Sequence, residues 1–335
     1  MKQRHQLIIG IAISVIFLVI FLRNTNFTEA SSALTAANKS LIAVSIVVYF
    51  VGVWVRSFRW KLLMKPLAKL NANSLFSLVT IGLMVNDILP GRLGIVARGY
   101  MIGEKKGISK LASGATVITE NILDGLALIL ILLVGILLIP TPALIKTIGW
   151  IAAALFGGVF IVMLIVTYSE NRAQLIVHIV TAITPKKWKV RMSNWVNLFI
   201  SGLAILRSPG ELIMIFLVSL VVWLCESGTY YLVALSMNIV VPFYAMLLVT
   251  AIGSLSWTLI IISPGGLGTF DAIVKYTLTE ALGVASGLAL AYTVAIHAIL
   301  LIPVIILGFV FLARENMSLR EITKARKATK EEVSQ

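Results

Sequence analysis

The sequence predicts an all-helical integral membrane protein that crosses the membrane about six times. Of its 335 residues, 59% are hydrophobic and 13% are charged, whereas soluble domains carry about 25% charged residues. The apolar residues form long solid runs, not the short alternating strands of a transmembrane barrel. One cysteine excludes an intramolecular disulfide. Three separated histidines give no local metal motif, so we expect neither a metal nor a cofactor.

Six apolar runs are candidates for spanning helices, which need about 20 residues to cross the hydrocarbon core. The first run resembles a signal peptide. It is long for one and lacks a clear cleavage site, so we interpret it as an uncleaved span. The runs cover residues 7–22, 41–55, 111–139, 143–167, 211–235 and 286–313.

Two further apolar segments, residues 74–102 and 244–283, are interrupted by proline and glycine. Proline ends a helix, and glycine adopts backbone conformations that other residues avoid. The arms beside the first interruption are shorter than a full span, so a re-entrant helical hairpin fits better than two spans. A simple turn at the membrane surface is the alternative. The interruptions contain Pro90, Gly91 and Gly94 in the first segment and Pro264, Gly265, Gly266 and Gly268 in the second.

The basic residues predict the orientation. If both hairpins return to the side from which they enter, 24 of the 28 Lys and Arg residues fall on the cytoplasmic side, including a cluster at 56–69. Cytoplasmic loops carry such an excess. We therefore expect a protein of the cell membrane with both termini in the cytoplasm. A single membrane domain covers residues 1–313, with a cytoplasmic amphipathic segment at 168–210 and a basic tail at 314–335.

The two interrupted segments also predict an internal repeat. The halves, about 1–140 and 143–313, each consist of two spans, a hairpin and another span, and the charge count gives them opposite orientations. In transporters with inverted repeats, the discontinuous helices meet near the midplane and form the substrate site. A helix that begins after each break offers N–H groups to an anion such as a phosphate.

Several ionisable residues lie within or beside the apolar runs, where a charge costs at least about 2.5 kcal/mol. Glu120 and Asp124 are four residues apart and share a helix face, and Glu226 is the clearest acid without a partner. Two interpretations stay open. One is an internal salt-bridge network. In the other, Arg92 and Arg98 bind a lipid phosphate while the acids balance their charge or bind a cationic headgroup. The acids with this predicted role are Asp87, Glu120, Asp124, Glu226 and Asp271.

One histidine, His297, lies in the last predicted span. A lone histidine in such a helix more often forms a hydrogen bond to a neighbouring helix than it relays a proton. We therefore interpret His297 as a helix–helix contact, with a proton relay as the alternative.

The residues from Asn86 to Gly94 (NDILPGRLG), followed by Arg98, Glu120 and Asp124, resemble the lysylphosphatidylglycerol synthase transmembrane (flippase-like) family. The stretch SPGGLG at 263–268, followed by an acid, adds to this resemblance, which covers roughly residues 7–313. The sequence departs from the family pattern at three positions. Ile95 stands where Glu is usual, Asn121 where Arg is usual, and Asp271 where Glu is common.

The resemblance implies lipid handling. In the best-known members, the membrane part is fused to a soluble aminoacyl-transferase domain that attaches lysine to phosphatidylglycerol, and the membrane part moves the product between leaflets. No such domain is recognisable in this sequence, which favours a flippase-like protein for a phospholipid or lipid-linked headgroup over an enzyme. The alternatives are a membrane subunit of a lipid-modifying transferase, such as a phosphatidylglycerol lysyltransferase, and a scaffold for another envelope enzyme. The expected partners are a membrane lipid and a second copy of the chain or an envelope enzyme, but no nucleic acid.

Overall fold

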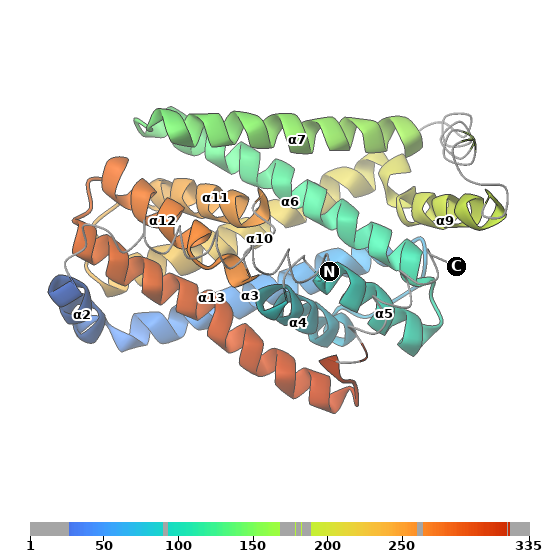
Figure 1. Cartoon of the computed structure of the whole chain (residues 1–335), viewed down its shortest axis with the longest axis horizontal. Coiled ribbons are helices and arrows are strands. Elements are labelled where there is room, and N and C mark those ends of the chain that lie inside the picture. The colour runs from blue at the N-terminus through green and yellow to red at the C-terminus, as the bar shows by residue number, and fades with distance from the viewer. Residues whose placement is uncertain are drawn as a thin grey trace, which may run out of the picture.

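The structure is a computed structural model that describes residues 27–89, 93–167, 189–259 and 264–319, with the isolated positions 178, 182 and 321. Every regular element in these ranges is a helix (Figure 1). Five helices are long and apolar enough to cross a membrane: α3 (Lys39–Met64), α6 (Lys110–Leu138), α7 (Ala143–Thr167), α10 (Pro209–Ser236) and α13 (Ser286–Arg314). The predicted polytopic helical membrane protein is confirmed. The first predicted span, residues 7–22, lies outside the described residues.

The helices begin where the sequence supplies a capping group. The Asn38 side chain accepts hydrogen bonds from the backbone N–H groups of Ser40 and Leu41 at the start of α3, and Ser109 accepts one from Ala112 at the start of α6. Such caps satisfy N–H groups that have no partner within the helix. The short helix α2 (Phe27–Ala36) precedes α3, and the helix α9 (Lys189–Gly202) and the 3₁₀ helix η2 (Ala204–Arg207) lie in the described part of the predicted amphipathic segment.

The second span is longer than predicted. Apolar residues continue past the expected end at residue 55, and α3 runs to Met64. Arg56 and Arg59 therefore lie within the helix, and the whole of Arg59 is buried. The predicted end of this span at residue 55 was too early, and helical periodicity places both arginines on the face that packs against the other helices. The cytoplasmic location of the cluster at 56–69 stays a prediction.

Both interrupted segments are broken helices. The first consists of α4 (Ala72–Ile88) and α5 (Gly94–Lys106), and the second of α11 (Phe243–Leu259), the 3₁₀ turn η3 (Pro264–Gly266) and α12 (Thr269–Glu280). Gly265, Gly266 and Gly268 have φ values of 60°, 70° and 82°, which favour glycine over residues with a Cβ. Pro90, Gly91 and Arg92 lie outside the described residues. None of the four α-helical arms reaches the length of a full span, and re-entry from one face stays a prediction.

The helices α3 and α10 cross with opposite chain directions at the centre of the molecule. At one end the Asn38 N–H donates to the Ser236 carbonyl over 2.8 Å, and at the other end Lys65 pairs with Glu211. At the crossing Gly52 allows close approach, because a Cβ there would lie 3.2 Å from the Cβ of Cys225. Residues 41–65 and 211–235 have the same order of buried, half-buried and exposed positions.

The remaining helices pack reciprocally around this pair. The broken helix of each half contacts the long helix that ends the other half, so α4 packs on α13 and α11 packs on α6. Within each half, α4 contacts α3 and α11 contacts α10 in the same way. In Figure 1, α7 lies along the outer side of α6 and α13 along the opposite side of the molecule. This arrangement brings the turn η3 of the second break against α4.

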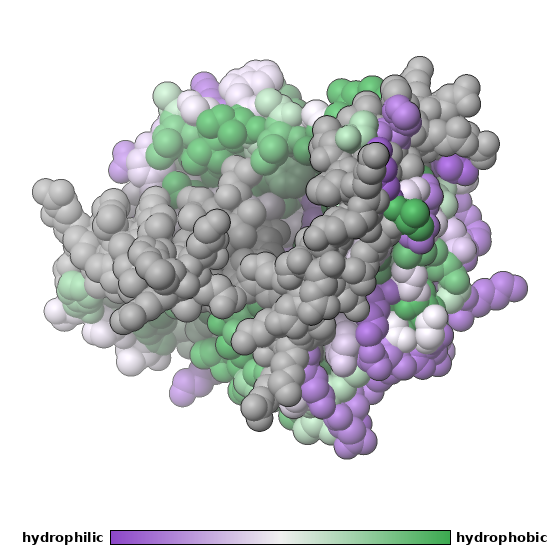
Figure 2. Space-filling model, turned by 45° about the vertical axis from the view of Figure 1, so that its right-hand side comes forward, coloured by the Kyte–Doolittle hydropathy of each residue, from purple (hydrophilic) through white to green (hydrophobic). Residues whose placement is uncertain are grey.

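The surface fits an apolar surrounding medium. Large apolar side chains are exposed along the spanning helices, among them Leu137, Trp150, Ile151 and Ile213. In Figure 2, hydrophilic residues gather toward the right of the view, while apolar residues cover much of the remaining coloured surface. Exposed apolar area on this scale marks a membrane or partner interface. The structure thus describes a multi-pass membrane protein.

Candidate functional site

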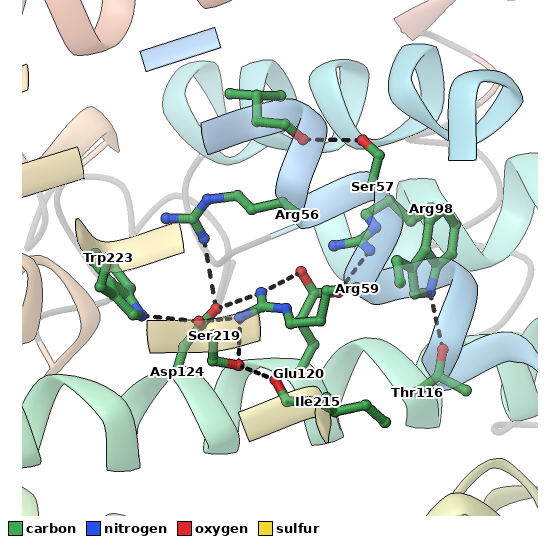
Figure 3. Close-up of polar contacts among 12 residues, drawn as sticks. Arg56, Ser57, Arg59, Arg98, Thr116, Glu120, Asp124, Ile215, Ser219 and Trp223 are labelled. Atoms are coloured by element: carbon green, nitrogen blue, oxygen red, sulfur yellow. Dashed lines mark hydrogen bonds and ion pairs between the residues drawn. The ribbon is translucent and has the colours of Figure 1, made fainter. Parts of the chain in front are cut away.

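A buried network of arginines and carboxylates lies between α3, α5, α6 and α10 (Figure 3). Arg59 is at its centre. One guanidinium nitrogen, Nη2, lies 2.7 Å from Glu120 Oε1 and 2.9 Å from Asp124 Oδ2, and the other, Nη1, also binds Asp124. On one side, Arg98 Nη2 donates to Glu120 Oε2 over 2.6 Å. Glu120 therefore bridges two arginines.

The network continues through Arg56 to α10. Arg56 Nη2 lies 2.7 Å from Glu226 Oε2, and Nη1 lies 3.5 Å from Asp124 Oδ2. The Asp124 carboxylate also accepts a hydrogen bond of 2.9 Å from Trp223 Nε1. Three arginines thus face three carboxylates, so the cluster is formally neutral. Charge balance and hydrogen bonding are the conditions under which buried ions are tolerated.

Further contacts fix the arginines in place. Arg59 Nη1 donates to Ser219 Oγ over 2.8 Å, and the Arg98 guanidinium lies 4.0 Å from the centre of the Trp60 ring. The Nε atoms of Arg59 and Arg98 are buried without a hydrogen-bond partner within the described structure. Arg98 is therefore held by Glu120 and Trp60, as Arg56 is held by Glu226 and Asp124.

The structure brings together most of the predicted acids. Glu120 and Asp124 share a face and meet arginines, as expected, and Arg98 pairs with Glu120. The expectation that Glu226 is unpaired is wrong, since Arg56 binds it. Sequence analysis missed Arg56 and Arg59. Their spacing of three residues, within a stretch at 56–64 that still carries five apolar residues, was the available signal.

The first helix break is held by a side chain from its own first arm. The Gly94 N–H donates to Asn86 Oδ1 over 2.7 Å. The arms approach closely here, because a Cβ on Gly94 would lie 2.2 Å from the Gly82 carbonyl oxygen. A Cβ on Gly82 would in turn lie 2.7 Å from the side chain of Arg98. Gly82 and Gly94 thus let α5 lie where Arg98 can reach Glu120.

The second helix break is held by Asp271 and His297. Asp271 Oδ2 accepts a hydrogen bond of 2.8 Å from the Gly268 N–H, and Oδ1 lies 2.5 Å from His297 Nδ1. The other ring nitrogen, Nε2, lies 2.9 Å from the Gly265 carbonyl oxygen. His297 therefore makes the helix–helix contact that we expected. Asp271 lies at this turn and does not border the cavity between the breaks.

The two breaks touch each other. A Cβ on Gly265 would lie 3.2 Å from the Asp87 carbonyl oxygen, and η3 packs against α4. Beside this contact lies a cavity of about 160 Å³. Its ionisable lining residues are Arg56, Asp87, Asp124, Glu226 and Tyr49, and Trp223 and Trp257 supply aromatic walls. The breaks and the arginine–carboxylate network thus border one polar space.

Asp87 differs from the other acids of the cavity. No hydrogen bond or ion pair joins its carboxylate to any residue of the described ranges, whereas Glu226 and Asp124 bind arginines. In the same ranges no three His, Cys, Asp or Glu side chains come together in a way that could hold a metal ion. The Asp87 carboxylate is therefore a group that a cationic ligand could use without displacing an arginine of the described ranges.

Comparison with protein-family models matches residues 7–308 to the lysylphosphatidylglycerol synthase TM region. The chain belongs to this family. The matched range contains both broken helices and all six residues of the arginine–carboxylate network, so the site described here lies in the membrane region that defines the family. Family membership indicates a membrane protein linked to lipid handling. A search of the curated proteins gives no match. Asn121, where the family usually carries Arg, borders the cavity.

Proposed function

We propose that this member of the lysylphosphatidylglycerol synthase TM family is a flippase-like lipid translocase, and that a lipid headgroup enters the cavity between the two helix breaks. One observation carries the proposal: Asp87 and Gly265, at the two breaks, lie against each other beside a polar cavity. Broken backbone at membrane depth is tolerated only where it is buried in protein or lines a wet cavity. A headgroup needs such a path through the hydrocarbon core.

The arrangement of the two halves supports alternating access. The equivalent helices α3 and α10 run in opposite directions, and each broken helix packs on the last helix of the other half. Transporters with inverted repeats move one repeat against the other around a fixed central site. In the proposal, α4–α5 and α11–α12 are re-entrant from opposite faces of the cell membrane, and both termini are cytoplasmic.

The cavity favours a headgroup that carries both a phosphate and an ammonium group. Arg56 borders the cavity and presents a planar guanidinium, which suits a phosphate. Asp87 provides a carboxylate that has no partner within the described ranges, and the Trp257 ring provides a face for a cation. In this proposal Arg56 takes the phosphate role that sequence analysis gave to Arg98, because Arg56 borders the cavity beside the two breaks and Arg98 does not. The phosphate-binding roles of Arg92 and of Pro90 and Gly91 stay predictions outside the described residues.

The test is lipid movement in vesicles containing the purified full chain. Acyl-labelled phosphatidylethanolamine carries phosphate and ammonium, and acyl-labelled phosphatidylglycerol carries phosphate alone. Dithionite destroys the fluorescent label only on the outer leaflet. Lipid that moves from the inner to the outer leaflet therefore loses the fluorescence that was protected from dithionite. We expect the wild type to move phosphatidylethanolamine faster than phosphatidylglycerol. Asp87→Asn should lower the rate for phosphatidylethanolamine about tenfold, since one charged contact contributes about 1.5 kcal/mol or more. It should lower the rate for phosphatidylglycerol less.

Two variants make the result specific. Lys65→Met removes an exposed charge from the same molecule far from the cavity and should leave both rates within a factor of two. Arg56→Gln should lower the rate for both lipids, because both carry the phosphate. Vesicles with folded protein and no movement of either lipid would reject the proposed translocase. Equal effects of Asp87→Asn on both lipids would reject the ammonium site.

A further inference from the structure

We propose that His297 and Asp271 form a proton-binding site that controls the turn of the second broken helix and, through it, the cavity. The part of this inference that concerns lipid movement rests on the proposed function. The proton site itself rests on the geometry around His297, which no step of the headgroup path uses. Both residues are buried, each with 5% of its surface exposed.

The hydrogen-bond geometry fixes the number of protons. His297 Nδ1 faces the Asp271 carboxylate over 2.5 Å, and Nε2 faces the Gly265 carbonyl oxygen over 2.9 Å. A carbonyl oxygen only accepts, so Nε2 must carry a proton. The contact between Nδ1 and the carboxylate needs a second proton, held by either partner. The pair therefore holds two protons and is neutral overall. Loss of one proton leaves a net charge of −1.

The surroundings of the pair make the loss of a proton energetically costly. The rings of Trp257 and Phe270 lie 5.5 Å and 5.0 Å from the His297 ring, centre to centre. Apolar walls and low exposure leave little water to replace a lost hydrogen bond, and an unpaired polar group in such a place is costly. In the described ranges Asp271 is the carboxylate that forms an ion pair with His297. Titratable or charged groups on the elements that pack against α12, α13 or η3 include Arg56 (α3), Asp87 (α4), Glu226 (α10), Tyr244 (α11) and Glu29 (α2), together with Lys275 on α12 itself.

The proton links the pair to the contact between the breaks. When one proton leaves, the remaining one stays between His297 and Asp271, because the carboxylate is the stronger acceptor. The Nε2 lone pair then faces the lone pairs of the Gly265 carbonyl, and this hydrogen bond is lost. Gly265 is the residue that touches the backbone of Asp87 at the cavity. Deprotonation therefore releases the turn at the point where the two broken helices meet.

The corresponding link in the first half cannot titrate in this way. There the second arm, α5, is tied to the following helix, α6, by Arg98 and Glu120. In the second half, α12 is tied to α13 by Asp271 and His297, so the acid and the base have exchanged helices. Arginine stays protonated in proteins, whereas histidine changes charge near neutral pH. A change of pH thus acts on the second helix break and leaves the first one tied. In the proposal, this difference lets a proton control the motion of one half against the other.

The first experiment measures the proton directly, without altering the site. The chain has three histidines, so His5→Gln with His178→Gln leaves His297 alone. In lipid nanodiscs, ¹⁵N NMR of this single histidine reports the protonation of both ring nitrogens across the pH range in which the chain stays folded. We expect both nitrogens to carry protons at the acid end and Nε2 to lose its proton within the range. A ring that keeps the same protonation over the whole range would overturn the proton site.

The second experiment tests control of the turn. Hydrogen exchange of the peptide covering 264–268, corrected for the intrinsic effect of pH on exchange, should rise about tenfold at the pH where the NMR signal changes. His297→Gln cannot titrate and should remove this pH dependence, whereas His178→Gln, at an exposed position, should keep it. Asp271→Asn, which retains an acceptor for the Gly268 N–H, should shift the pH of the transition. A transition that is unchanged in His297→Gln would overturn control by this residue.

The third experiment distinguishes the proposed translocase from the proposed proton site. The rate of lipid movement in vesicles is measured across the same pH range for the wild type and His297→Gln. We expect a pH dependence in the wild type that is lost in the variant. If no lipid moves at any pH, the proposed translocase fails, while NMR and hydrogen exchange still decide the proton site. If lipid moves with the same pH profile in both proteins, regulation by the pair is refuted.

Discussion

Arg56 and Glu226 occupy equivalent positions in α3 and α10 and bind each other, with Arg56 Nη2 2.7 Å from Glu226 Oε2. They are 170 residues apart, which is the offset at which the burial patterns of the two helices coincide. The bond therefore joins corresponding points of the two halves across their shared crossing. Because both side chains also border the cavity, this pair connects the packing of the halves to the proposed site.

A charge swap tests this pair. Arg56→Glu alone places three carboxylates together and should lower the stability of the protein in detergent by about 3–5 kcal/mol, the usual effect of breaking a buried pair. Adding Glu226→Arg restores the opposite charges at equivalent positions and should recover at least half of the loss. Thermal unfolding followed by tryptophan fluorescence measures both. A double variant no more stable than Arg56→Glu would contradict direct pairing.

The central arginine should be the most sensitive residue of the network. Arg59→Met keeps an apolar stem but leaves Glu120 and Asp124 with one fewer shared cation, so we expect a loss of about 3–5 kcal/mol and poor yield of folded protein. Lys65→Met, on the same helix, removes a charge whose side chain is 62% exposed, and should change stability by less than about 1 kcal/mol. Equal losses of stability in both variants would mean that the contribution of Arg59 to stability does not depend on its burial.

Three glycines should rank in a fixed order when replaced by alanine. Gly94→Ala drives a Cβ against the rigid Gly82 carbonyl. The close contacts of Gly82→Ala are with the flexible Arg98 side chain, since the Gly94 carbonyl oxygen lies at an ordinary 3.5 Å, and Gly114 has nothing within 4 Å of an added Cβ. We expect losses of about 3 kcal/mol for Gly94→Ala and about 1 kcal/mol for Gly82→Ala. Gly114→Ala, inside α6, should stabilise slightly because alanine favours helix. Melting temperatures in one detergent give the order, and any other ranking counts against the close contact of α4 and α5.

A single substitution should lock α3 to α10. A Cβ at position 52 would lie 3.2 Å from the Cβ of Cys225, close to the separation found in disulfides. Gly52→Cys should therefore form an intramolecular disulfide with the native cysteine under mild oxidation, visible by mass spectrometry as loss of two free thiols. Gly52→Cys with Cys225→Ser provides the control and should keep its one thiol free. Two free thiols in the oxidised Gly52→Cys protein would show that the helices do not cross here.

The sequence was sufficient for the helices and their breaks. Long apolar runs predict spanning helices, because an unpaired backbone group in hydrocarbon is costly and a helix pairs its own. Proline and glycine mark the interruptions for local steric reasons, and α4 begins and α12 ends within a few residues of the expected limits. The shared face of Glu120 and Asp124 also follows from helical spacing alone.

The partners of the charged residues depended on the tertiary structure. Arg59 reaches Asp124 across 65 residues and Arg56 reaches Glu226 across 170, and no local pattern encodes contacts at such separations. An arginine near the end of an apolar run has the same sequence signature whether it faces the cytoplasm or a carboxylate on a neighbouring helix. Its burial is decided only when α3, α6 and α10 pack together, since that packing supplies the opposite charges that make a buried arginine stable.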